Sequence, residues 1–146
     1  MCYLRYSILF MLFSHTIGAA AEISINNAWI NEAPPGVKVL AAYMTIINNG
    51  TEEIRLVKAD SNMFEKIEFH VTQMNDGVAS MHRQDSISIP DRSSFSFSPG
   101  GYHLMLFNPG SQLRSGDIVP VELTFSNGVI LRVEAGVRRA EIEHSH

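Results

Sequence analysis

Two short stretches of this sequence each carry a histidine and a methionine that could bind a soft metal ion. In "GGYHLMLFNPG", His103 and Met105 stand two residues apart within an apolar run. In "KIEFHVTQMNDGVASMHR", His70 and Met81 lie on either side of a cluster of turn residues. Two imidazoles and two thioethers form a neutral, soft ligand set, which favours Cu(I) over zinc, calcium or magnesium.

The alternation of side chains along a strand decides which face carries the first pair. Leu104 and Leu106 share one face of the apolar run, and His103 and Met105 share the other. If the leucine face is the core, the histidine and the methionine both point away from it. In a strand buried on both faces, Met105 would instead be ordinary packing and His103 a hydrogen-bonded core histidine.

The second pair belongs to a predicted β-hairpin. Apolar and polar residues alternate around His70 and place it on the polar face of its strand. A two-residue loop at Asp76 and Gly77 would pair Thr72 with Met81. His70 and Met81 would then be diagonal neighbours on one face, with Cβ atoms roughly 5–8 Å apart. A three-residue loop would break this arrangement.

The elements that must position these residues are all predicted to be strands. Short β-rich runs alternate with Gly, Pro and Asn turn signals, and no window has a sustained helical stripe. We therefore expect an all-β single domain, a Greek-key β-sandwich or barrel. The predicted strands are 22–30, 38–48, 54–61, 65–72, 78–83, 86–89, 94–98, 102–107, 118–125 and 129–137.

The ends of the chain predict export. Residues 1–21 resemble a secretory signal peptide, 22–137 form the predicted domain, and 138–146 are a polar tail expected to be flexible. Cleavage would remove Cys2, the only cysteine, and leave no disulfide or thiolate ligand in a periplasmic protein. The net charge of −4 argues against a nucleic-acid partner. No later segment is long and apolar enough for stable membrane insertion.

The two pairs together resemble the fingerprint of the PCuAC-like periplasmic copper chaperones, H-x10-M-x21-H-x-M. It falls on His70, Met81, His103 and Met105 with every spacing met, and the resemblance covers Ile25 to Val133. The stretches "NDGVASM", "PGGYHLML" and "GDIVPVELTF" also resemble the sequences of this family. The resemblance implies a cupredoxin-like fold that binds one Cu(I) at an exposed site through these four side chains. It also implies delivery to the Cu(A) centre of cytochrome c oxidase, often with a thiol-containing copper-transfer partner.

Other candidate residues have simpler explanations. His82 should face the opposite side of its strand from Met81, and Met74 should be an exposed methionine near the hairpin tip. Met74 could also be a docking thioether. Trp29 and Tyr43 are expected to be core aromatics.

Three functional hypotheses follow. We expect a copper chaperone; copper storage or detoxification and a binding module without metal are the alternatives. No catalytic constellation is present in the sequence, which argues against an enzyme. His144 and His146 could bind Cu(II) weakly, but a solvated terminus is the better explanation of them.

Overall fold

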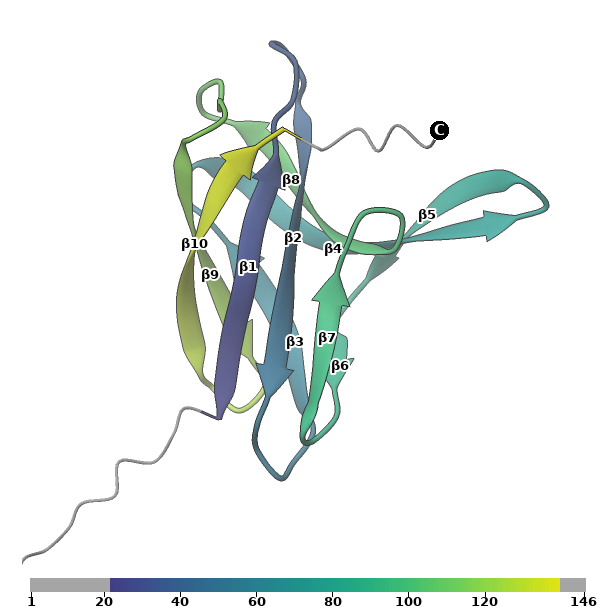
Figure 1. Ribbon diagram of the computed structural model, residues 1–146, viewed down its shortest axis with the longest axis vertical. Coiled ribbons are helices and arrows are strands. Elements are labelled where there is room, and N and C mark those ends of the chain that lie inside the picture. Colours follow the sequence, from purple (N-terminus) through teal and green to yellow (C-terminus); the bar gives the residue numbers. More distant parts are fainter. Residues whose placement is uncertain (1–21, 140–146) are drawn as a thin grey trace, which may run out of the picture.

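The computed structural model describes residues 22–139, which form ten strands and their connecting turns (Figure 1). Each of the ten predicted runs is a strand, and the all-β prediction is confirmed. The strands are β1 (Ile23–Asn31), β2 (Val39–Asn48), β3 (Ile54–Asp60), β4 (Phe64–Asn75), β5 (Val78–Gln84), β6 (Ile87–Ile89), β7 (Ser93–Phe97), β8 (Tyr102–Pro109), β9 (Ile118–Phe125) and β10 (Ile130–Arg138).

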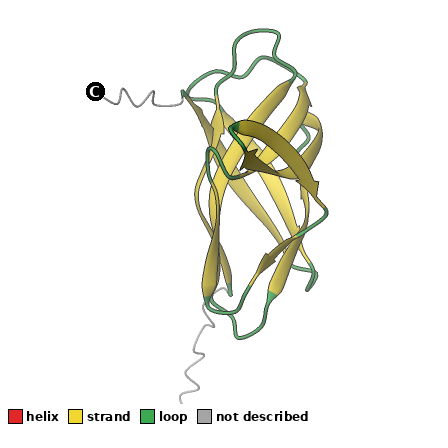
Figure 2. Cartoon of the chain, turned by 90° about the vertical axis from the view of Figure 1, so that its right-hand side faces the viewer, coloured by secondary structure: helices red, strands yellow, loops and turns green. Residues whose placement is uncertain are grey.

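The strands pair in the order β5-β4-β8-β2-β1-β10-β9-β3-β6, and β7 pairs with the end of β2. All the pairings are antiparallel except that of β1 with β10. This connected sheet curls around one core as an elongated sandwich (Figure 2), so that β3 and β4 also come into contact. Strands remote in sequence, such as β4 and β8, therefore become neighbours.

The core is filled by the inward faces of the alternating strands. Leu104 and Leu106 of β8 are fully buried, as are Ala42 of β2 and Leu123 of β9. The leucine face of β8 is therefore the core face, as the alternation predicted. Met105 lies on the other face and is only half-buried.

A buried asparagine closes the end of the core. Asn48 is 1% exposed, and its Nδ2 donates to the backbone carbonyls of Glu52, Ile89 and Pro90 at 2.8–3.2 Å. Its Oδ1 accepts from the backbone N–H of Gly50 at 3.0 Å. A buried polar group is tolerated when its hydrogen bonds are made, and these bonds fix the loop after β2.

The hairpin of β4 and β5 projects from the side of the sandwich (Figure 1). β4 pairs with β8 as far as Val71, and beyond that residue it pairs with β5 alone. The turn has Asp76 at φ 49° and Gly77 at φ 78°, both in the left-handed region that a two-residue type I′ hairpin loop requires. No helix that could cross a membrane occurs in residues 22–139.

Candidate metal centre

His70 of β4 and His103 of β8 are direct partners in the antiparallel register. Their ring centroids are 6.1 Å apart, and the ring planes differ by 25°. This pairing joins the two sequence stretches, which lie on strands separated by the hairpin and by β6 and β7. The two histidines therefore lie side by side on one face of the sheet.

The two methionines lie on the same face as the histidines. Met105 is two residues from His103, and its register partner is Glu68, two residues from His70. Met81 pairs with Thr72, which makes it the diagonal neighbour of His70. The predicted register of the hairpin is confirmed, with the two-residue loop. The face thus carries all four side chains that the sequence singled out.

Burial differs sharply among these four residues. His103 is 7% exposed, whereas Met81 is 61% exposed. The side chain of His70 is 14% exposed. The expectation of an exposed site is therefore wrong for the histidines, which lie beside each other and contact Glu68 and Gly101. Only the Met81 side of the group opens widely to solvent.

Each imidazole has one hydrogen-bonded nitrogen. Nε2 of His70 lies 2.9 Å from Oε2 of Glu68, and Nδ1 of His103 lies 3.1 Å from the carbonyl oxygen of Gly101. Nδ1 of His70 is buried and has no hydrogen-bond partner among the described residues. A buried, unpaired nitrogen is costly unless something else binds it, and a metal ion would do so.

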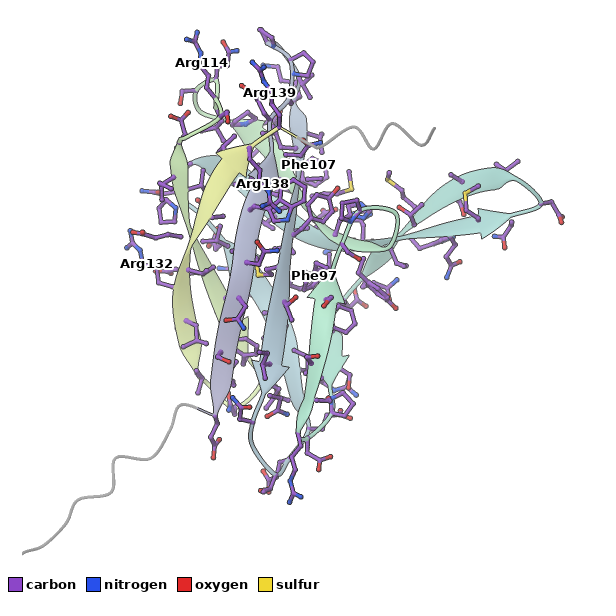
Figure 3. The ribbon with its side chains drawn as sticks, in the orientation of Figure 1. Phe97, Phe107, Arg114, Arg132, Arg138 and Arg139 are labelled. Carbon is purple, nitrogen blue, oxygen red and sulfur yellow. The ribbon has the colours of Figure 1, made fainter. Side chains whose placement is uncertain are left out.

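A short chain of polar contacts extends from His70 along β4. Glu68 accepts from Nζ of Lys66 at 2.9 Å through its second carboxylate oxygen. Nζ of Lys66 lies 4.5 Å from the ring centroid of Phe107, which is labelled in Figure 3. The hydrogen bond from His70, then that from Lys66, and the charges of Lys66 and Arg83 lower the pKa of Glu68 to about 2. Glu68 is therefore a carboxylate at neutral pH.

The chemistry of this face suits a soft ion. The described residues contain no cluster of three or more His, Cys, Asp and Glu side chains that could hold a metal ion, so a conventional hard-ligand site is absent from residues 22–139. His70, His103, Met81 and Met105 supply two imidazoles and two thioethers on this face, beside the Glu68 carboxylate that is hydrogen-bonded to His70. Such a set matches Cu(I), which accepts soft ligands and low coordination numbers.

The other candidates are placed as follows. His82 pairs with Val71 on the opposite face and has its Nε2 3.1 Å from the hydroxyl of Ser80, so it points away from the four residues, as predicted. Met74 is 66% exposed and lies on the same hairpin face as Met81. Figure 3 shows sulfur atoms along this hairpin. His144 and His146 lie outside the described residues.

The prediction that Trp29 and Tyr43 are core aromatics is wrong. They are register partners on β1 and β2, half-buried, with ring centroids 4.7 Å apart. Since Ala42 and Met44 face the core, Tyr43 must face outward on the strand that flanks β8. The guanidinium of Arg138, which is labelled in Figure 3, lies over the Trp29 ring, 4.0 Å from its centroid.

Glu68 and Lys66 were not singled out by sequence reasoning. A signal existed, because Glu68 precedes His70 by two residues and therefore shares its strand face. Lys66 lies on the same face by the same rule. A carboxylate on a histidine's face is common, so the pattern alone did not distinguish a structural partner from a solvated charge.

Comparison with known proteins agrees with this architecture. Residues 23–137 match the family model described as "Putative lipoprotein LpqE-like". A curated relative, "Putative lipoprotein Lxx21020" of Leifsonia xyli subsp. xyli, is 30% identical over 117 residues, which are 79% of this chain and 69% of that protein.

Solved structures show the same fold. The copper-bound PCuAC domain from PmoF2 superposes with a TM-score of 0.71 at 24% identity, over 84% of this chain and 97% of that one. The solution structure of Cu(I)-bound DR1885 from Deinococcus radiodurans gives 0.67 at 27% identity, over 86% and 83%. The predicted cupredoxin-like sandwich is confirmed. The chain belongs to the LpqE-like family, and its sandwich is a PCuAC-like domain.

Proposed function

We propose that this protein is an exported copper chaperone, not an enzyme, that binds one Cu(I) through His70, Met81, His103 and Met105. The observation that carries the proposal is the register of β4 against β8, which makes His70 and His103 direct partners. Both methionines share their face. The buried, unpaired Nδ1 of His70 supports a ligand at this place. The relatives support copper as that ligand, since the PmoF2 domain is copper-bound and DR1885 is Cu(I)-bound in their structures.

The structure suggests how such a site would release its ion. His103 and Met105 belong to the body of the sandwich, whereas Met81 lies on the projecting hairpin and is 61% exposed. An incoming ligand could therefore replace Met81 first, while the other three side chains still hold the ion. Neutral thioethers bind Cu(I) less firmly than thiolates, so exchange with a stronger acceptor would be favourable.

The proposed acceptor is the Cu(A) centre of cytochrome c oxidase, with a thiol-containing protein as a further transfer partner. This part of the proposal rests on the resemblance to the PCuAC-like chaperones. Export rests on the signal-like residues 1–21, and the lipoprotein description of the family supports a place outside the cytoplasm. We propose the periplasm as that place. The signal peptide at 1–21 and the flexible tail at 138–146 also remain predictions, although Arg138 is the last residue of β10 and Arg139 donates to Glu32.

Two measurements test the proposal. Cu(I) titration against a competing chelator should give one equivalent bound, and wild-type binding no tighter than that of a variant without both methionines would refute a Cu(I) site. The loaded protein is then mixed with an apo Cu(A) domain. Transfer faster and more complete than from free copper supports a chaperone, whereas retention of the ion by the protein would indicate storage.

A further inference from the structure

We propose that Glu68 is a positioning residue that sets the tautomer of His70, so that the two histidines offer different nitrogens to the metal. His70 would bind through Nδ1 and His103 through Nε2. The inference rests on the proposed Cu(I) site and specifies its geometry. Three sets of contacts carry it, and each is a feature of the chain itself.

The first contact fixes the proton of His70. An ionised carboxylate can only accept a hydrogen bond, so the 2.9 Å contact with Oε2 of Glu68 requires the proton on Nε2 of His70. A neutral imidazole then has its lone pair on Nδ1. That atom is the buried nitrogen without a hydrogen-bond partner in residues 22–139. The lone pair that the tautomer leaves free therefore belongs to the same atom that lacks a hydrogen-bond partner.

The second contact gives His103 the opposite tautomer. A carbonyl oxygen also only accepts, so the 3.1 Å contact with Gly101 requires the proton on Nδ1 of His103 and leaves its lone pair on Nε2. The same carbonyl accepts the backbone N–H of Thr72 at 3.1 Å, which ties it to the base of the hairpin. The acceptor of the His103 hydrogen bond is therefore a fixed point of the backbone.

The third set of contacts holds Glu68 in place. Its Oε1 accepts from Lys66, and Lys66 lies over the ring of Phe107 on β8. The carboxylate is thus held from both sides, with one oxygen for each donor. Its side chain is 14% exposed, so the hydrogen bond to His70 is largely protected from water. Arg83, the β5 partner of His70, adds a positive charge nearby.

Outer partners of this kind orient metal-binding histidines and increase their basicity, and their loss typically weakens metal binding by about 10–100-fold. We expect Glu68→Ala to weaken Cu(I) binding on that scale, because His70 would lose its preferred orientation and tautomer. Glu68→Gln keeps an acceptor oxygen without the charge and should recover part of the affinity. Glu65→Ala on the same strand removes an exposed carboxylate that contacts Asn108, and should leave the affinity unchanged.

The test is two-dimensional ¹H–¹⁵N NMR of the histidine rings in the metal-free protein above pH 8, combined with Cu(I) titration of the same samples. Wild type should show a protonated Nε2 in His70 and a protonated Nδ1 in His103. Glu68→Ala should broaden or average the His70 nitrogens and leave those of His103 unchanged.

A protonated Nδ1 in wild-type His70, or Glu68→Ala with unchanged His70 nitrogens and unchanged affinity, would overturn the inference. The ring signals are read without copper, so they decide the tautomers even if wild type binds no Cu(I), in which case the proposed function alone fails. Should Glu68→Ala not fold, the Glu68→Gln variant carries the comparison. Its Cu(I) affinity must then be lower than that of wild type, and its His70 nitrogen signals must shift from those of wild type toward the values of averaged tautomers.

Discussion

His70 and His103 face each other across β4 and β8, with ring centroids 6.1 Å apart. The pair sits where the β4–β5 hairpin leaves the body of the sandwich, since β4 stops pairing with β8 at Val71. One histidine therefore belongs to a strand that continues into the projecting hairpin, and the other belongs to a strand fixed in the core. Any ligand held by both would couple the hairpin to the body.

The two thioethers on the histidine face should contribute to Cu(I) binding, whereas a third on the hairpin should not. We expect Met105→Ala and Met81→Ala each to weaken Cu(I) binding at least about tenfold, the scale on which even outer partners of a metal site act. Competition with a Cu(I) chelator measures this. Met74→Ala is the matched control, because Met74 is as exposed as Met81 and lies on the same hairpin. A loss of Cu(I) affinity in Met74→Ala equal to that in Met81→Ala would contradict the assignment of Met81 as a ligand.

The turn at Gly77 should set the stability of the hairpin and little else. Gly77 has φ 78°, so an alanine there is strained by about 1 kcal/mol. We expect Gly77→Ala to accelerate hydrogen exchange of the β5 amides by about fivefold, since 1 kcal/mol corresponds to that factor. Gly36→Ala imposes the same strain at φ 84° in another turn, with nothing within 4 Å of the added Cβ. If both variants accelerate hydrogen exchange of the β5 amides equally, the hairpin does not open independently of the rest of the domain.

Asn48 should stabilise the fold without affecting the candidate site. Replacing it with alanine removes four hydrogen bonds, one of them to the buried carbonyl of Ile89. We expect a loss of about 2–3 kcal/mol in the free energy of unfolding. Urea denaturation of the metal-free protein measures it. Asn49→Ala, at an exposed neighbouring position, should change stability by less than about 0.5 kcal/mol, and equal losses would contradict the role of Asn48.

The ion pair of Glu32 should make part of the stability depend on pH. The hydrogen bond from Arg139, then that from the backbone of Ser115, lower the pKa of Glu32. A carboxylate with a lowered folded-state pKa stabilises the fold above its unfolded-state pKa, near 4.5, and this contribution disappears as the pH falls through the folded-state pKa. Glu32→Gln should therefore be less stable than wild type at pH 7, and the difference should shrink at pH 3. A difference that is constant with pH in urea denaturation would rule this out.

The sequence predicted the hairpin and the strand faces because both follow from local rules. Asp76 and Gly77 have the conformations that a two-residue loop demands, so the pairing of Thr72 with Met81 could be read from the turn. Alternation placed Leu104 toward the core and Met105 away from it for the same kind of reason.

The features that the sequence did not predict depend on contacts between strands that are distant in the sequence. His103 is buried, with His70 of β4 and Gly101 of the turn before β8 beside it, and no local pattern describes these neighbours. Trp29 and Tyr43 look like core residues by type, but their outward face is decided by the neighbours Ala42 and Met44. The hydrogen bond between Glu68 and His70 depends on side-chain orientation, which alternation leaves open.

Copper K-edge X-ray absorption of the Cu(I)-loaded protein tests the central claim most directly, with the Met81→Ala plus Met105→Ala variant measured beside wild type. A site built from these four side chains predicts a mixed shell of nitrogen and sulfur neighbours in wild type and the loss of the sulfur contribution in the variant. A wild-type shell of nitrogen and oxygen only, or a sulfur contribution that the double substitution leaves unchanged, would contradict it.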